Sequence, residues 1–202
     1  MSRIEPARTD AHLREAYRFW YDVYVKEMGR HQHDPLTDHS ARLQIDPIAP
    51  YGNLLLARDA EGRVVGTLMS TWTTEPAVEK YVALYQLDAL NARQRAHSTV
   101  TTKLMVAPEY RCSRLGMLLA RESYRWGLAN GVHYDFIDCN DHLVSFFEKL
   151  GYRPHLGEIQ HQVYGRVNSM YLAVNDEVHL FNQRSPFYRP LAQHQEASRV
   201  YA

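Results

Sequence analysis

The 202-residue chain has no excess of either charge, because 23 Lys and Arg residues balance 23 Asp and Glu residues. A protein that holds nucleic acid through its overall charge is basic, so this balance argues against that class and leaves only local basic patches open. The chain also has only two cysteines, and no basic stretch followed by an apolar one opens it, which predicts reduced thiols and a cytoplasmic location. No apolar run approaches the roughly 20 residues that a membrane span requires.

Metal-ligand spacings are also missing, although the chain has eleven histidines. No H-x-x-x-H, H-E-x-x-H or C-x-x-C pattern places two ligands on one face, so we predict no metal site. No internal repeat appears either. Composition is that of an ordinary globular protein, with 45% hydrophobic and 23% charged residues. We therefore predict one domain over residues 1–188 and a C-terminal tail over 189–202, with a partly extended path after Ser185-Pro186.

Hydrophobic periodicity predicts a mixed α/β order with at least one strand-helix-strand crossover. Helices are expected at Asp10–Gly29, which Asp10 caps, at Arg114–Asn130 and at His142–Leu150, with a short one at Ser40–Ile45 in the loop His31–Pro50. Strands are expected at Asn53–Arg58, Arg63–Thr73, Thr99–Val106 and His133–Cys139, and one or two within Gln160–Val174. Residues 74–97 read as partly helical.

The segment after the strand Thr99–Val106 has the features of an anion site. Pro108 stops the strand, an Arg-rich turn follows, and Gly116 stands at the start of a long helix whose first N–H groups face outward. Arg111 and Arg114 are placed to add charge-assisted bonds to phosphate, and Gly116 lets a ligand approach the backbone. The alternative is a solvated helix start with no ligand.

This segment resembles the acyl-CoA motif of the GNAT superfamily, which is Arg or Gln, two residues, Gly, one residue, then Gly or Ala. Arg111 and Gly116 match it, whereas Arg114 replaces the first Gly. Downstream, Ser145–Tyr152 (SFFEKLGY) resembles the family's "fYeklGF" helix. The resemblance implies a GNAT-like mixed, mostly antiparallel central sheet with helices on both faces, split at the centre by the acyl-donor site. It implies that these residues bind the donor: Met105, Val106, Arg111, Arg114, Leu115, Gly116 and Asn140.

Within this superfamily the chain resembles N-acyl amino acid synthases and, more distantly, N-acylhomoserine lactone synthases, over most of residues 13–188. The likeness is carried by the segments Ala16–Arg30, Asp46-Pro47, Val65–Thr67, Asp138–His142 and Tyr164–Met170. It implies a donor that is acyl-CoA or an acyl carrier protein with its phosphopantetheine thioester, and a small-molecule amine as acceptor. The synthases often carry a carboxylate on the fourth strand, and Thr99–Thr102 offer none.

An amine must be neutral to attack a thioester, so a base is expected near the carbonyl. Candidates are Asp138, His142 and Glu109. Asp141 also fits, although it is better explained as the N-cap of the following helix. Many GNAT enzymes use a Tyr to protonate the departing thiolate, and that position is Phe147 here. Another acid then serves, or the thiolate leaves unassisted, as a thiol pKa of about 8.5 permits.

Other interpretations stay open at this stage. Cys139 next to His142 has the elements of a covalent nucleophile, but a strand cysteine is more often an inert small apolar residue. The aromatic stripe Tyr17, Trp20, Tyr21 and Tyr24 lines an acyl tunnel or is plain core. For the whole chain, the alternatives are an acetyl-CoA-dependent small-amine acetyltransferase and a non-catalytic GNAT-fold module that binds acyl groups or ligands.

Overall fold

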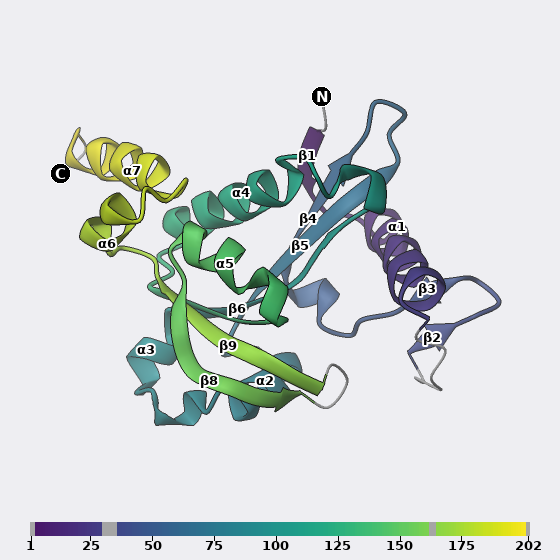
Figure 1. Cartoon of the computed structure of the whole chain (residues 1–202), viewed down its shortest axis with the longest axis horizontal. Coiled ribbons are helices and arrows are strands. Elements are labelled where there is room, and N and C mark those ends of the chain that lie inside the picture. Colours follow the sequence, from purple (N-terminus) through teal and green to yellow (C-terminus); the bar gives the residue numbers. More distant parts are fainter. Residues whose placement is uncertain (1–2, 30–35, 162–164, 201–202) are drawn as a thin grey trace. The chain divides into compact units, whose positions relative to one another are not determined.

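The structure is a computed structural model that describes residues 3–29, 36–161 and 165–200 (Figure 1). Parts of five predicted segments lie outside these residues: 31–35 of the loop, 162–164 of the strand region 160–174, the last two residues of the tail, and Arg30 and Tyr164 of two synthase-like segments. Seven strands form one sheet in the order β1-β4-β5-β6-β7-β9-β8. They are β1 (Arg3–Pro6), β4 (Asn53–Arg58), β5 (Val64–Trp72), β6 (Ser98–Val106), β7 (Tyr134–Cys139), β8 (Arg153–His161) and β9 (Gly165–Ala173).

The sheet is mainly antiparallel, since β4 pairs antiparallel with both β1 and β5, and β9 with both β7 and β8. The strands β6 and β7 run parallel, paired from Ser98 opposite Tyr134 to Val100 opposite Phe136. A parallel pair needs a crossover, which the helix α4 (Leu115–Ala129) supplies. Helices flank this sheet, so the predicted fold class is confirmed.

Contacts divide the chain into two compact units, each of which draws on two segments. The first comprises residues 1–70 and 103–120, and the second comprises 71–102 and 121–202. Both β5 and β6 therefore contribute residues to each unit. The predicted division into a domain over 1–188 and a tail over 189–202 stays a prediction.

In the first unit, α1 (Asp10–Tyr21) continues into a π-helical stretch, η1 (Asp22–Glu27). This confirms the long first helix, but its cap is Thr9, whose side chain accepts a bond from the His12 N–H, and not the predicted Asp10. The helical stretch ends at Glu27 with Met28 as its C-cap, and Gly29 follows with a φ of +65°. This conformation suits glycine after a helix C-terminus.

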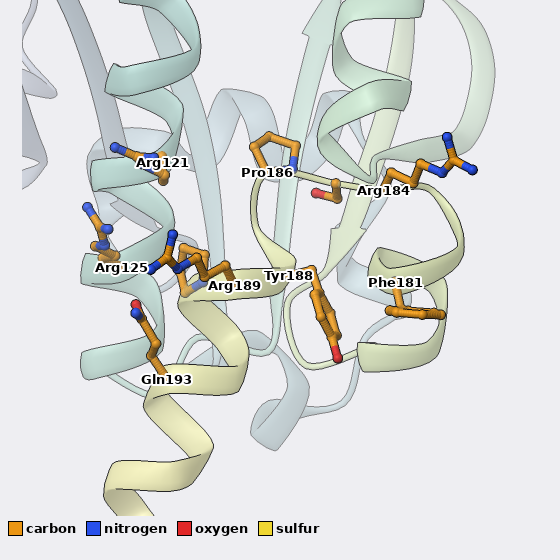
Figure 2. A pocket seen from close by; sticks show the side chains of 10 residues that line it. Arg121, Arg125, Phe181, Arg184, Pro186, Tyr188, Arg189 and Gln193 are labelled. Carbon is orange, nitrogen blue, oxygen red and sulfur yellow. The ribbon is translucent and has the colours of Figure 1, made fainter.

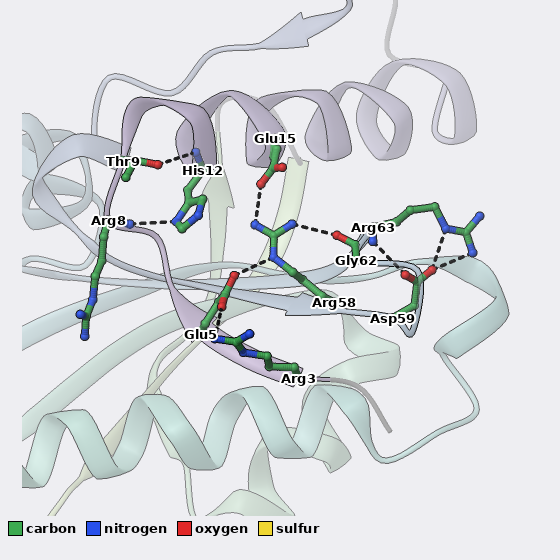
Figure 3. A network of polar contacts seen from close by, with 10 residues as sticks. All are labelled: Arg3, Glu5, Arg8, Thr9, His12, Glu15, Arg58, Asp59, Gly62 and Arg63. Atoms are coloured by element: carbon green, nitrogen blue, oxygen red, sulfur yellow. Dashed lines mark hydrogen bonds and ion pairs between the residues drawn. The ribbon is translucent and has the colours of Figure 1, made fainter.

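The sequence analysis missed β1. Ion pairs of Arg58 link this strand to α1 (Figure 3). The Arg58 guanidinium lies 2.7 Å from a Glu5 oxygen on β1 and 2.5 Å from a Glu15 oxygen on α1. The Arg58 hydrogen bond also lowers the pKa of Glu5. The four residues of β1 have only one strongly apolar side chain, so they show no periodicity that predicts a strand. Pairing with β4 forms the strand instead.

The predicted hairpin at residues 53–73 is confirmed as β4 and β5, but the predicted helix Ser40–Ile45 is wrong. That stretch belongs to a second hairpin, β2 (Thr37–Asp38) and β3 (Leu43–Gln44). Asp38 explains the difference, because its side chain accepts bonds from the Ser40 hydroxyl and the Ala41 N–H and so closes a turn. A turn stabilised by local side-chain bonds competes with a helix.

In the second unit, residues 76–96 hold η3 (Pro76–Val78), α2 (Glu79–Leu84), η4 (Leu87–Ala89) and α3 (Ala92–Ala96). The predicted helix after β7 is α5 (Asp141–Leu150), which contacts β9. Strand structure begins at Arg153, not at the predicted Gln160. Beyond β9 come α6 (Glu177–Asn182) and α7 (Tyr188–Val200), so the predicted partly extended tail is wrong. Burial of Phe187 and Leu191 explains this helix better than its polar sequence does.

Gly151 ends α5 with a φ of +112° in a crowded place. An added Cβ would lie 2.4 Å from Leu180 Cδ2, and Leu180 is fully buried. We expect Gly151→Ala to lower the free energy of unfolding by about 2–4 kcal/mol, through backbone strain and overpacking together. Urea unfolding measures this loss. The matched control is Gly62→Ala, where φ is +81° but nothing lies within 4 Å, so only about 1–2 kcal/mol is expected and equal losses would contradict the packing argument.

Within the described ranges, no helix is both long and apolar enough to cross a membrane.

Candidate active site

The predicted phosphate loop lies in the first unit, between β6 and α4. After Val106 the chain forms η5 (Pro108–Tyr110), and α4 begins at Leu115. The Ser113 hydroxyl oxygen accepts a 3.1 Å bond from the Leu115 N–H and donates to the Tyr110 carbonyl, which fixes the entry to the helix. The next N–H groups of the first turn have no partner inside the helix. This is the arrangement that binds phosphate at helix N-termini.

Leu115 is buried, and its role here is packing. A Cβ placed on Gly66 of β5 would lie 3.4 Å from Leu115 Cδ2, 3.1 Å from Leu119 Cδ1 and 3.2 Å from the Met105 carbonyl. Gly66 therefore lets the start of α4 and the end of β6 approach β5 closely. Sequence reasoning placed this glycine in a strand but did not give it this role.

Arg111 does not stand free beside the loop. Its Nη atoms lie 2.5 and 2.6 Å from the two Glu27 oxygens, and its Nε donates to the Val106 carbonyl at 2.9 Å. The Arg111 hydrogen bond also lowers the pKa of Glu27. A phosphate that binds Arg111 must therefore share or replace a bidentate carboxylate partner. Arg114 and Glu109 lie exposed in the same segment.

A second polar cluster of the first unit surrounds Lys103, a strand residue with a φ of +58°. Its Nζ lies 2.9 Å from Asp46 Oδ2 and about 5 Å above the rings of Trp20 and Tyr24. The Thr67 hydroxyl accepts from Trp20 Nε1 and donates to the Lys103 carbonyl, both at 2.9 Å. Fully buried and bonded in this way, Trp20 is a core residue. An acyl tunnel along Tyr17 and Tyr24, which are half-buried, stays a prediction.

In the second unit, Asp138 lies near the carboxyl end of β7 and is half-buried. Its Oδ2 accepts a 2.8 Å bond from the hydroxyl of Tyr85, a fully buried residue whose carbonyl is 2.9 Å from His155 Nε2. Burial raises the pKa of Asp138, against the opposing effects of the Tyr85 bond and the positive charge of His161. A partly accessible carboxylate with a raised pKa suits a general base.

Sequence reasoning missed Tyr85 and His161. Tyr85 follows α2 in the stretch 74–97, where the pattern was too mixed to place a side chain. The rings of Tyr81 and Tyr85 lie 6.0 Å apart, and those of Tyr81 and His161 lie 6.5 Å apart, so an aromatic wall adjoins Asp138. The i, i+4 spacing of Tyr81 and Tyr85 was the available signal.

Among the described residues, the other predicted residues of this segment form no hydrogen bond or ion pair with that cluster. Asn140 is the exposed N-cap of α5, so the prediction that Asp141 caps this helix is wrong. Asp141 is the first residue of the helix, and its side chain accepts a 2.7 Å hydrogen bond from Asn168 Nδ2. His142 is exposed in the first turn. No hydrogen bond joins Asp138 to His142 in the part of the chain that the structure describes. The structure thus brings Asp138 together with Tyr85 and His161 instead.

Cys139 is buried and lies 3.7 Å from the Met170 sulfur, and burial raises its pKa to about 12. A thiol of this kind is not ionised near neutral pH, which supports the inert interpretation. Phe147 is also buried, with its ring 5.4 Å from that of Tyr152. Among residues 3–29, 36–161 and 165–200, no three His, Cys, Asp or Glu side chains group as metal ligands.

Asp135 is fully buried on the other face of β7, bonded by the hydroxyls of Thr99 at 2.6 Å, Thr101 at 2.8 Å and Tyr152 at 2.5 Å. Burial raises its pKa from 3.8 to about 6, although these three bonds oppose the rise. The contribution of this group to stability is therefore complete below about pH 4 and lost as pH rises through about 6.

We expect the unfolding free energy of the native chain to fall by about 2 kcal/mol relative to Asp135→Asn between pH 4 and pH 7, at about 1.4 kcal/mol for each pKa unit. The Asn side chain is neutral throughout, so the other titrating groups cancel in the difference. Urea unfolding of both proteins across this pH range measures it. A difference that does not change with pH would show that Asp135 is not held neutral in the fold.

The profile of the Acetyltransferase (GNAT) family matches residues 13–152, which is more than half of the chain. The chain belongs to the GNAT family. A sequence search of curated proteins found no match. Solved GNAT-like structures extend the comparison, because they align over nearly the whole chain.

Two of these structures are CoA-dependent acyl-homoserine lactone synthases. BjaI, solved with MTA, has a TM-score of 0.69 at 16% identity over 92% of this chain and 91% of its own. MesI has a TM-score of 0.65 at 18% identity over 96% of this chain and 94% of its own. Escherichia coli ElaA has a TM-score of 0.58 at 13% identity over 85% of this chain and 99% of its own. At these identities the likeness establishes the GNAT fold of this chain.

Proposed function

We propose that this GNAT protein is a cytoplasmic N-acyltransferase that moves an acyl group from an acyl-CoA or acyl carrier protein thioester to the amine of an amino acid or a similar small molecule. The observation that carries the proposal is the half-buried Asp138, held by Tyr85 and with a raised pKa, in a chain of this family. A base of this kind removes the proton that otherwise keeps an amine from attacking.

The donor is proposed to bind at the loop before α4. Its phosphate oxygens accept bonds from the first N–H groups of the helix, and Gly116 leaves room for that approach. Arg111 and Arg114 add positive charge, and the Glu27 carboxylate competes for Arg111. Met105 and Val106 lie at the end of β6 beside the loop, and Asn140 is proposed to meet the donor from the start of α5.

The proposed reaction is a direct attack. Asp138 takes a proton from the ammonium form of the acceptor, the neutral nitrogen forms the new C–N bond at the thioester carbonyl, and the C–S bond breaks. The thiolate then takes up one proton as the amide nitrogen loses its second, so charge and protons balance. Because Phe147 has no proton to give, no dedicated acid is assigned. Cys139, with a pKa of about 12, is not proposed as a covalent carrier.

BjaI has also been solved with isopentyl-CoA, which favours an acyl group longer than acetyl, and a GNAT acetyltransferase from Staphylococcus aureus with this fold favours the acetyl-CoA alternative. The test is to mix the protein with acetyl-CoA, a long-chain acyl-CoA or an acyl carrier protein charged with the same chain, each with a pool of amino acids. Mass spectrometry then identifies any amide. N-acyl amino acids from long-chain donors support the proposal, amides from acetyl-CoA alone favour the small-amine acetyltransferase, and donor binding without any amide favours the non-catalytic module.

A further inference from the structure

A cavity of about 700 Å³ lies in the second unit, away from Asp138, between the second half of α4 and the segment that runs from α6 into α7 (Figure 2). Its volume is in the range of small-molecule sites, which is roughly 300–1,000 Å³. Four arginines line it: Arg121 and Arg125 from α4, Arg184 after α6, and Arg189 from α7. No acidic residue is among the described residues that line it.

Three of the four arginines come from α4 and α7, and the fourth follows α6. Figure 2 shows Arg121, Arg125 and Arg189 together on one side of Tyr188, and Arg184 on the other. Arg125 has an ion pair with Glu122, one turn away on α4. The Nε of Arg121 is buried and has no hydrogen-bond partner in the structure. A buried N–H without an acceptor is costly, and so is the approach of like charges.

A bound anion removes the second cost, because it lies between the like charges. Guanidinium groups match phosphate oxygens in pairs, and such bonds are about twice as strong as neutral ones. The four arginines and Glu122 together carry a net charge of about +3, which a terminal diphosphate, with a charge of about −3 at neutral pH, balances. Phe181 is 60% exposed, and its ring packs edge-on against that of Tyr188 at 5.2 Å, so the pocket also offers an aromatic face.

We propose that this arginine pocket binds a small ligand that carries a diphosphate group. This site is separate from the loop at Gly116, and it does not depend on the proposed acyl transfer. Two sources share the chemistry: inorganic pyrophosphate and a nucleoside diphosphate, whose ring would lie on Phe181 and Tyr188. Stacking on aromatic side chains tolerates any base, so the structure assigns the diphosphate and not a particular nucleoside.

The test is calorimetric titration of the full chain with pyrophosphate and with ADP. Arg121→Gln combined with Arg189→Gln is expected to weaken binding of either probe at least tenfold, whereas the exposed Arg93→Gln, which removes one charge outside the pocket, leaves it unchanged. Arg189→Gln alone, on an exposed position, keeps the test valid if the double variant does not fold. Tighter binding of ADP that is lost in Phe181→Ala supports a nucleotide, and equal binding of both probes supports the diphosphate alone.

Two results would overturn the proposal. One is no binding of either probe up to about 10 mM, which corresponds to less than about 3 kcal/mol of binding free energy. The other is binding that survives loss of the arginines but disappears in Gly116→Asp, because the anion would then be held at the predicted donor loop. In the arginine pocket, Gly116→Asp is expected to leave the affinity for pyrophosphate unchanged.

Discussion

Replacing Asp138 with Asn is expected to lower kcat by about 10²- to 10⁴-fold, which is the usual contribution of a general base. Asn keeps the shape of the side chain and a hydrogen bond to Tyr85, but it cannot take a proton from the acceptor amine. Donor affinity should not change, because the predicted phosphate contacts lie in the segment Met105–Gly116. Steady-state rates with a saturating donor measure the effect. The matched control is Asp141→Asn, an exposed carboxylate three residues away, for which we expect no large change in rate.

The pH profile separates catalysis by Asp138 from a structural role. The base must be ionised, so activity is expected to fall as pH falls through the raised pKa of Asp138. The Tyr85 hydroxyl stabilises the ionised form, so Tyr85→Phe should move this acid limb to higher pH while the plateau rate changes less. An acid limb at the same pH in Tyr85→Phe would contradict the assignment of Tyr85 as a positioning residue.

Gly116→Asp is expected to weaken donor binding by about 100-fold or more, since an added carboxylate would face the donor phosphates. Two like charges about 4 Å apart repel by up to about 4 kcal/mol near a protein surface. An acidic residue near a helix N-terminus is itself favourable, so the stability of the fold should hold. Titration with acyl-CoA and urea unfolding measure the two quantities. Gly116→Ala is the matched control without charge, and an equal loss of affinity there would assign the effect to bulk alone.

Substitutions of Arg111 and of its partner Glu27 are expected to change donor affinity in opposite directions. Arg111→Ala removes a proposed phosphate contact and should weaken donor binding more than it affects stability. Glu27→Gln removes the negative charge that now pairs with Arg111. We expect donor binding to tighten several-fold, because the guanidinium no longer has to give up an ionised carboxylate in order to bind phosphate. If donor affinity is unchanged in Arg111→Ala, in Glu27→Gln and in Gly116→Asp, the phosphate-loop assignment is contradicted.

The part of the fold that the sequence predicts is the part with strong local patterns. The hairpin Asn53–Trp72 and the helices α4 and α5 are each marked by periodicity and by a turn or cap residue, and the structure has all of them. The stretch Ser40–Ile45 and the chain after Ser185 gave the wrong structure. In the first, Asp38 closes a turn through its own side-chain bonds; in the second, burial of Phe187 and Leu191 stabilises a helix that its polar residues did not suggest.

For a similar reason, the sequence predicted the loop of the candidate site but not the partners of Asp138. A motif marks the residues of the loop Arg111–Gly116, because backbone geometry there depends on a short local sequence. The partners of Asp138 are Tyr85, which is 53 residues earlier, and His161, which is the last residue of β8. Contacts between segments so far apart depend on sheet order, which spacing in the sequence does not give. The Glu27 partner of Arg111 is 84 residues away and was missed for the same reason.

The most direct test of the central claim is release of free thiol from acyl-CoA, followed with and without an amine acceptor and combined with the intact mass of the protein. Direct transfer predicts that thiol and amide appear in equal amounts, that both require the amine, and that no acylated protein accumulates when the amine is left out. Asp138→Asn should lower both rates together. Donor binding with no thiol release under any acceptor, or an acyl adduct on Cys139 in the absence of amine, would contradict the account.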